Sequence, residues 1–460
     1  MFKKIEIWIL WLVILAGILF TIGFGTLVRQ ELIGRDRAGL VGWATNAALF
    51  LAELPINVIK MVSSPLTVED RFPELAGFNG IPNASQSFLL LTRYDGDLDE
   101  SVVELVDLSN FQRLHTWNPD IDAFNEAVKD LPDFKYITRD TNNKRGAISH
   151  ALLTKDGGLL FQGRSPLRKI DACSNLIFQN GHDQFHHSIE TDIDDNIWVP
   201  SLMYPQVVAS YKVGRGLTEE GGFGDDGIVK LSPEGKIIFE KSVSQIFIDN
   251  DLEHRLFAIG DSFSSGKGDF HSDPIHLNDI QPVNFDGKFW KKGDVFLSLR
   301  HQSMILLYRP STNEIVWKLT GQFFHPHDVD ILDAHRISFF NNNSKDFYNG
   351  NWVDGHNEVL VYDFNTNTTI SYLKDSLEKY DVRTITGGRS EILPNGDLFI
   401  EETNFARLLY FNADGSLRWS YVNRAENGGV YQTHWPRLMY NAGDLNNVKT
   451  FLKNRPHCND

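Results

Sequence analysis

From Ser85 onward, the chain alternates short apolar runs with polar turns. Runs such as SFLLLTRYD, SVVELVDLS, GDVFLSL and SMILLYRPSTNEIVWKL have the length and the β-branched and aromatic content of strands. Turn dipeptides recur between such runs, and their glycine accepts the positive φ that closes a hairpin. These pairs are Asp156-Gly157, Glu234-Gly235, Asn395-Gly396 and Asp414-Gly415. The pattern predicts an all-β antiparallel fold, which could be a sandwich, a barrel or a propeller.

An internal repeat favours the propeller. His327 is followed ten positions later by Ile337 across HDVDILDAHRI, and His187 is followed ten positions later by Ile197 across HSIETDIDDNI. Each segment is a histidine, a short alternating run, a turn and a new strand. About six such units can be counted, and equivalent positions in a propeller face one central axis. We therefore expect a six-bladed β-propeller in which distant residues share one pocket.

The N-terminal stretch predicts a transmembrane helix. Ile7 to Val28 carries no charge and is long enough to span a bilayer. No small-residue cleavage site follows it, so we interpret it as an uncleaved anchor. Basic residues lie on both sides of it and do not fix its orientation. A single N-terminal anchor usually leads a translocated domain, so we expect a single-pass protein with a periplasmic or extracytoplasmic main domain. A domain on the cytosolic side is the alternative.

A second apolar stretch, Leu40 to Val62, is interrupted by Glu53 and Pro55. It fits a helix on the membrane surface or a helix packed on the globular domain better than a second span. The expected organisation is therefore an anchor at 1–30, a membrane-proximal helical or linker segment at 31–84, and the propeller at 85–460. Asn118 to Arg145 interrupts the strand pattern, and we expect a helix there around Ile121 to Leu131.

Charge and cysteine usage narrow the function further. The formal net charge is −16 and no long basic run occurs, which argues against a nucleic-acid partner. Cys173 and Cys458 have neither CxxC nor metal-ligand spacing. In an exported protein they could pair, but the sequence does not give their separation in space.

Three histidines and one arginine are the candidates for catalysis. His276 and His327 each lie at the start of a predicted strand, Arg300 lies between them, and His187 matches His327 in the repeat. A neutral imidazole is a competent nucleophile, and a guanidinium binds an oxyanion through two parallel hydrogen bonds. Converging histidines could alternatively hold zinc or iron, although a guanidinium among the ligands would repel a cation.

The same residues lie in motifs that resemble those of the bacterial aryl-sulfate sulfotransferases. HLND, SLRHQS and EIVWKL resemble that family's H-x-N-S, S-S-R-H-Q and Trp-ending strand, while FHHSI and FHPHDVDIL resemble its HHDI and QHDA-like motifs. The resemblance covers roughly residues 88–445. This chain departs from the family pattern at HLND, HHSI and HPHD. Studied members also carry a short-loop disulfide, for which Cys173 and Cys458 offer no equivalent.

The resemblance implies a six-bladed propeller enzyme that moves a sulfuryl group from a phenolic sulfate ester to a phenol without phosphoadenosine phosphosulfate. By motif match, His327 is the histidine that becomes sulfurylated. His276, Arg300 and His187 match the other catalytic positions. No cofactor and no metal is required by this scheme.

Further residues near these motifs are expected to contact substrate or to support the site. Arg389 could instead form a structural ion pair, and His434 could instead serve the closure of the ring. The chain could also be a non-catalytic propeller scaffold or binding subunit of an envelope membrane complex, and a homo-oligomer is possible. The candidate substrate-binding residues are Asn278, His186, His325, Arg389 and His434.

Overall fold

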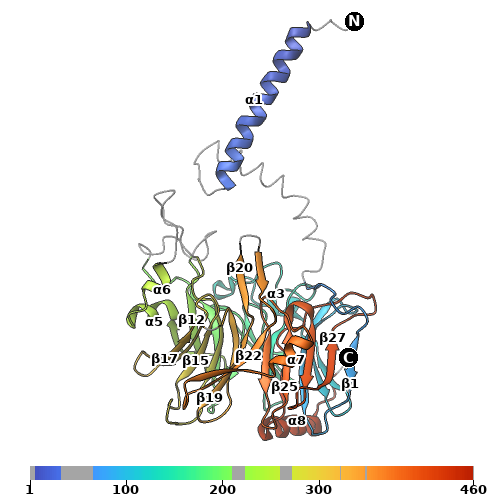
Figure 1. Cartoon of the computed structure of the whole chain (residues 1–460). Helices are drawn as coiled ribbons and strands as arrows, with labels where there is room; N and C mark the ends of the chain where they lie inside the picture. Colours follow the sequence, from blue (N-terminus) through green and yellow to red (C-terminus); the bar gives the residue numbers. More distant parts are fainter. Residues whose placement is uncertain are drawn as a thin grey trace. The chain divides into compact units, whose positions relative to one another are not determined.

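The computed structural model describes residues 6–32, 66–209, 223–258, 272–321, 323–347 and 350–458. The chain forms two compact units, Met1–Pro65 and Leu66–Asp460, the second of which is the β-structure of Figure 1. In the first unit, helix α1 (Ile7–Leu32) is long and apolar enough to cross a membrane, a test that a signal sequence would also pass. The apolar stretch at 40–62 lies outside the described residues.

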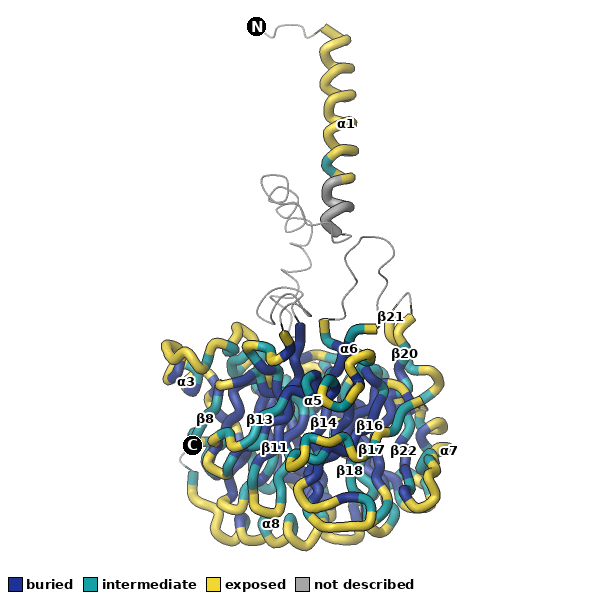
Figure 2. The backbone as a smooth tube through the Cα atoms, turned by 90° about the vertical axis from the view of Figure 1, so that its left-hand side faces the viewer, coloured by how far each residue is buried: buried dark blue, intermediate teal, exposed yellow. Residues whose placement is uncertain are grey.

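The second unit confirms the predicted six-bladed β-propeller. Its six main sheets each hold at least four antiparallel strands, and most neighbouring pairs of first strands contact one another around the axis. Buried residues run along these strands, while turns and outer surfaces are exposed (Figure 2).

We number the blades from the N-terminus and list their strands from the axis outward. Blade 1 holds β28 (Arg437–Met439), β2 (Phe88–Asp95), β3 (Glu100–Asp107) and β4 (Gln112–Trp117); blade 2, β5 (Ser149–Leu153), β6 (Leu159–Gln162), β7 (Leu167–Ile170) and β8 (Leu176–Asn180); blade 3, β10 (Glu190–Thr191), β11 (Ile197–Leu202), β12 (Asp226–Leu231) and β13 (Ile237–Ser242), with β9 (Gln184–Phe185) also on β11; blade 4, β14 (Leu277–Pro282), β15 (Val295–Leu299), β16 (Met304–Arg309) and β17 (Glu314–Thr320); blade 5, β18 (Pro326–Ile331), β19 (Arg336–Asn341), β22 (Glu358–Asp363) and β23 (Thr368–Tyr372); blade 6, β24 (Arg389–Ile392), β25 (Leu398–Glu402), β26 (Arg407–Phe411) and β27 (Leu417–Val422).

The ring is closed at two places. Strand β28 from the end of the chain completes blade 1, whose other strands come from its beginning. Strand β1 (Gly77–Gly80) adds a fifth strand to blade 6 by pairing with β27. At Gly80, φ is +126°, and a Cβ would lie 2.4 Å from the carbonyl oxygen of Arg418. Strand β1 lies within the 31–84 segment, so part of that segment belongs to the sheet.

The repeated histidines occupy equivalent places in two blades. Thr191 of β10 pairs with Ile197, and Ile331 of β18 pairs with Ile337. His187 and His327 each precede the inner partner of such a pair by four positions. The repeat therefore encodes an inner strand, a turn and the next strand outward.

Several short elements decorate the blades. The expected helix at 121–131 is shorter in the structure, where α3 spans Ile121–Glu126. The side chain of Asp120, just before it, caps the helix by accepting from the Ala123 N–H, and Pro132 already opens a 3-10 turn. The structure also contains helices, a 3-10 turn and a hairpin that the strand pattern did not predict. They are α5 (Val243–Asp249), α6 (His254–Phe257), β20 (Ser344–Phe347) with β21 (Gly350–Val353), α7 (Lys374–Lys379), the 3-10 turn at Thr403–Phe405 and α8 (Ala442–Asn454).

A disulfide joins Cys173 to Cys458, which resolves the pairing that the sequence left open. It lies just beyond α8, whose Val448 and Phe451 pack into the apolar core of blades 1 and 2. The Phe451 ring stacks on the fully buried Trp117 at 5.4 Å between centroids. Apolar burial of this kind contributes roughly 1.5–3 kcal/mol per large side chain. The disulfide therefore fastens an end of the chain that is already packed.

Candidate active site

Ring-bearing residues meet at the starts of the inner strands. His187, His276 and Trp435 stand immediately before or near β10, β14 and β28, and each has the left-handed backbone that non-glycine residues seldom adopt, with φ of +57°, +52° and +54°. The β-ladder is also irregular at Leu277–Asp279 and at His327–Val329. Such local departures redirect side chains and concentrate at functional sites.

The structure brings together the four residues predicted to be catalytic. The ring centroid of His187 lies 5.3 Å from that of His276 and 6.4 Å from that of His327. Arg300, which follows β15, lies close enough for its charge to act on both His187 and His327. The Trp435 ring lies 6.1 Å from both His187 and His327. Trp435 was not among the predicted residues, although the sequence places it directly after His434.

Asn342 fixes the orientation and tautomer of His327. The Asn342 amide nitrogen donates to the carbonyl oxygens of Thr384 (3.0 Å) and Gly387 (2.8 Å), so its oxygen faces the other way. That oxygen lies 2.6 Å from Nδ1 of His327 and can only accept. Nδ1 of His327 therefore carries the proton, and Nε2 keeps its lone pair.

The environment of His327 keeps the ring neutral. Only 1 % of the residue is exposed. Burial lowers its pKa well below 6.5, and the charges of Arg300 and His276 lower it further, while the hydrogen bond to Asn342 opposes them. A lowered pKa means that the uncharged ring, which is the nucleophilic form, persists into acidic solution.

Arg300 is a buried cation without a carboxylate partner. It is 7 % exposed, and within the described residues its guanidinium makes no ion pair within 4.0 Å, while its Nε has no hydrogen-bond partner. Its Nη1 donates to Nε2 of His301, 2.5 Å away. His301 can accept this bond because its Nδ1 donates to the backbone oxygen of Asp273 at 2.6 Å. A buried guanidinium with unused donors is suited to bind an anion.

His276 is paired with an acid. Its Nδ1 lies 2.6 Å from the Asp273 carboxylate, which orients the ring. Asp273 and His301 were missed as site residues. His301 lies inside the R-H-Q motif, so the motif contained a signal for it. Asp273 lies three positions before His276, and no pattern marked it.

Two further histidines, His186 and His325, lie beside the cluster. Nδ1 of His186 lies 2.6 Å from Nδ1 of His187, and its Nε2 lies 3.4 Å from Asp226. Nδ1 of His325 lies 2.8 Å from the Ser344 hydroxyl, and its ring lies 6.0 Å from that of His301. Burial lowers the pKa of His325 to about 4, so this ring is also neutral near pH 7.

The remaining candidate residues have other contacts. Asn278 donates to the Pro326 carbonyl oxygen at 2.9 Å and ties blade 4 to blade 5, directly beside His327. The guanidinium of Arg389 is compensated by Glu391 at 3.1 Å and Asp328 at 3.6 Å, as in the structural ion pair considered from the sequence. The His434 carbonyl accepts from His150 N–H and joins blades 1 and 2.

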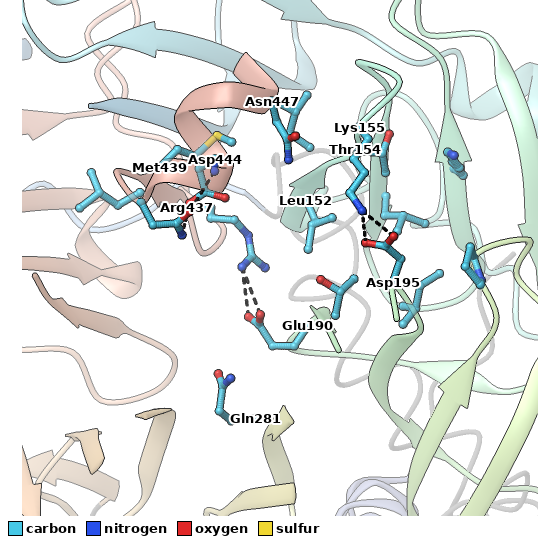
Figure 3. Close-up of a pocket in the computed structure, with 18 of the residues that line it drawn as sticks. Leu152, Thr154, Lys155, Glu190, Asp195, Gln281, Arg437, Met439, Asp444 and Asn447 are labelled. Atoms are coloured by element: carbon cyan, nitrogen blue, oxygen red, sulfur yellow. Dashed lines mark hydrogen bonds and ion pairs between the residues drawn. The ribbon is translucent and has the colours of Figure 1, made fainter. Parts of the chain in front are cut away.

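A cavity of about 490 Å³ lies among the inner strands near α8, away from the histidines. In Figure 3, Arg437 bonds Glu190 in this cavity, and Asp444 of α8 lies beside it. Its lining also includes the carboxyl groups of Asp330 and Glu391. Basic side chains, those of Lys155, Lys169 and Arg389 among them, also line the cavity, so its charge is mixed, whereas the histidine cluster with Arg300 favours an anion.

The residues Asp273, His276 and His301 lie close enough to share a metal ion. Both histidines, however, already direct Nδ1 to Asp273, and Arg300 lies 2.5 Å from the other nitrogen of His301. A cation there would meet the guanidinium at short range. The arrangement therefore suits an anion better than a metal.

Solved structures show remote likenesses to this chain. A Bacteroides caccae protein of unknown function is 12% identical, with a TM-score of 0.41 over 73% of this chain and 94% of its own. TolB from Acinetobacter baumannii is 10% identical, with a TM-score of 0.40 over 87% and 73%. These remote likenesses carry no functional argument. No curated protein matches the chain.

The model of the arylsulfotransferase (ASST) family matches residues 150–424, more than half of the chain and including all four residues of the cluster. The chain therefore belongs to the arylsulfotransferase family.

Proposed function

We propose that this enzyme transfers a sulfuryl group from a phenolic sulfate ester to a phenol or another hydroxyl acceptor through a sulfohistidine at His327, without phosphoadenosine phosphosulfate. The observation that supports this most is the pairing of two groups at one end of the axis. One is a neutral His327 whose Nε2 has no hydrogen-bond partner among the described residues, and the other is the Arg300 guanidinium, which has no ion pair within those residues and an unused Nε donor.

In the first half-reaction, Nε2 of His327 attacks the sulfur of the ester. The nitrogen–sulfur bond forms as the bond from sulfur to the phenolic oxygen breaks, and the electron pair of that bond leaves with the phenolate. His276, held by Asp273, donates a proton to the phenolate as general acid. Splitting the transfer into two steps avoids a direct reaction between the sulfate ester and the acceptor phenol.

In the second half-reaction, the acceptor hydroxyl takes the place of the departed phenol. The deprotonated His276 removes its proton while its oxygen attacks sulfur, and the electron pair of the nitrogen–sulfur bond returns to Nε2 of His327. This step returns the proton to His276 and leaves His327 free of the sulfuryl group, as at the start.

The surrounding residues bind the substrate in this scheme. Arg300 donates to the sulfuryl oxygens, where negative charge is concentrated. The pKa of His187 is held well below 6.5, mainly by burial and then by the neighbouring histidines, so its uncharged ring adds a hydrogen bond. Trp435 offers an apolar surface to the aryl ring.

Replacement of Asn342 by leucine should reduce the rate of His327 sulfurylation by about 10- to 100-fold, the usual effect of removing a group that orients a reactive histidine. Without the amide oxygen, the proton of His327 is free to move to Nε2 and occupy the nucleophilic lone pair. The reaction should be followed in a single turnover across pH, with melting temperature as the check on folding. Asn395→Leu, at an exposed turn, is the matched control. An unchanged rate in a folded Asn342→Leu variant would remove this positioning role.

The direct test of the function uses the whole chain in detergent. After incubation with 4-nitrophenyl sulfate alone, peptide mass analysis should find a sulfuryl group on His327, and addition of a phenol should discharge it. A non-catalytic scaffold would show neither the label nor 4-nitrophenol release with any of several acceptors.

We further propose that α1 anchors the enzyme as an uncleaved single span with the propeller on the extracytoplasmic side. The length and apolar composition of α1 support this. Extraction of the full chain from membranes by detergent but not by alkaline carbonate would agree, and so would protease access from outside. A mature chain that begins after α1 would show a cleaved signal instead.

A further inference from the structure

A second cluster of metal-ligating side chains lies in blade 3, apart from the histidine cluster of the axis. Ligand atoms of His182, Asp183 and Glu240 all lie within 4.8 Å of one another. His182 and Asp183 directly precede β9, while Glu240 lies on the outer strand β13. The cluster thus joins the segment that leads to His187 to the outer edge of the same blade.

Asp183 has an unused acceptor in a buried place. The residue is 2 % exposed, and its Oδ2 has no hydrogen-bond partner in the described part of the chain. Ser201 and Tyr136 both interact electrostatically with Asp183, and their buried hydroxyl oxygens also have no hydrogen-bond partner within the described residues. Buried polar atoms are nearly always satisfied in folded proteins, so several unsatisfied oxygens at one place point to a missing ligand.

The charge of this cluster is also uncompensated. Among the described residues, neither Asp183 nor Glu240 forms an ion pair with a basic side chain. Lys135, which acts on Asp183 electrostatically, has its ammonium group 5.0 Å from the Tyr136 ring centroid and 4.8 Å from that of Tyr204. Ligand oxygens of Asp183 and Glu240 lie within 4.8 Å of each other, and two carboxyl groups held this close are stabilised by a cation or a shared proton.

We propose that His182, Asp183 and Glu240 form a binding site for a divalent transition-metal ion of the zinc or manganese class. One imidazole nitrogen with two carboxylates suits such borderline cations, whereas calcium and magnesium prefer an all-oxygen set. The exposed His182 side chain can move, so the three ligands can close to the roughly 2 Å bond lengths that zinc requires. Ser201 and Tyr136 stand nearby to accept or donate hydrogen bonds at the rim of the site.

The ion would brace the active-site loop. His187 lies four positions after Asp183, and Phe185 between them pairs with Ser201 of β11. A metal bridge from Asp183 to β13 would hold this loop to two strands of blade 3. This role is structural and independent of the proposed sulfuryl transfer.

The test measures zinc binding to the full chain in detergent after removal of metal with a chelator and dialysis. Calorimetry should show a single zinc ion bound per chain, and zinc should raise the melting temperature. Asp183→Asn and Glu240→Gln, which preserve shape, should each weaken zinc binding by more than about 10-fold, the effect of losing even an indirect contact. Two variants in different elements keep the test valid if one of them fails to fold.

Asp333→Asn is the matched control. Asp333 and Asp363 flank His335 at 3.1 and 3.7 Å, so that site has the same kinds of residue, all of them partly exposed. The zinc affinity of the Asp333→Asn variant should equal that of the unsubstituted chain. The proposal is overturned if the chain binds no zinc, or if Asp183→Asn and Glu240→Gln bind it normally. If zinc binding is lost only in a His301→Gln variant, the ion lies at the active site and the proposal is likewise overturned.

Discussion

Replacement of His327 by asparagine is expected to abolish both sulfuryl transfer and covalent labelling. Asparagine retains polarity at a buried position but has no nucleophilic nitrogen, so the first bond to sulfur cannot form. Loss of the nucleophile in other covalent enzymes lowers turnover by about 10⁴-fold or more. The rate of 4-nitrophenol release and the mass of the peptide that contains residue 327 both report this loss.

The control for this variant is His335→Asn, which changes a partly exposed histidine at a turn of blade 5. It should retain full activity and full labelling. Melting temperatures of both variants establish that the propeller is intact. A folded His327→Asn protein that still becomes sulfurylated, for instance on His187 or His276, would assign the nucleophile to a different ring.

Replacement of Arg300 by alanine should lower the turnover number by about 100- to 1,000-fold, the usual effect of removing one donor to a developing oxyanion. Binding of a sulfate-free phenol should change much less, because it carries no sulfuryl oxygens. Arg300→Lys should recover only part of the rate, since lysine restores the charge but not the planar pair of donors.

Arg300→Ala should also shift the pH dependence of the single-turnover rate in a definite direction. The positive charge of Arg300 helps to hold the pKa of His327 below 6.5. Its removal raises that pKa, so neutral His327 is lost at a higher pH as the solution is acidified. The acidic limb of the single-turnover rate should therefore move to higher pH. Arg336→Ala, on the exposed start of β19, should leave rate and profile unchanged. Loss of activity without any shift of the limb would mean that Arg300 supports the fold rather than the site.

The strand pattern and its repeat were sufficient to predict the propeller. Alternation, turn dipeptides and the equal spacing of His187–Ile197 and His327–Ile337 are local features, and the strands of blades 2 to 5 follow one another in the sequence. Similar units must stack to bury their apolar faces, so a repeat of this length leaves few other folds. The repeat also located residues near the axis, because equivalent positions in a propeller face the same way.

Residues without a repeat or a motif could not be found in this way. Asn342 orients His327 through one hydrogen bond, and Asp273 orients His276 through another. The importance of both residues appears only when the folded chain places them against these histidines. Trp435 comes from the closing blade, which combines both ends of the chain and therefore departs from the regular pattern.

The sequence by itself determined the class of fold, the count of blades and the chemistry available at the axis. Only the tertiary structure decided the pairing of Cys173 with Cys458, the contribution of β1 to blade 6 and the tautomer of His327. These features depend on distances between segments that are far apart in the chain. Local preferences do not encode such distances, because ring closure and packing between blades set them.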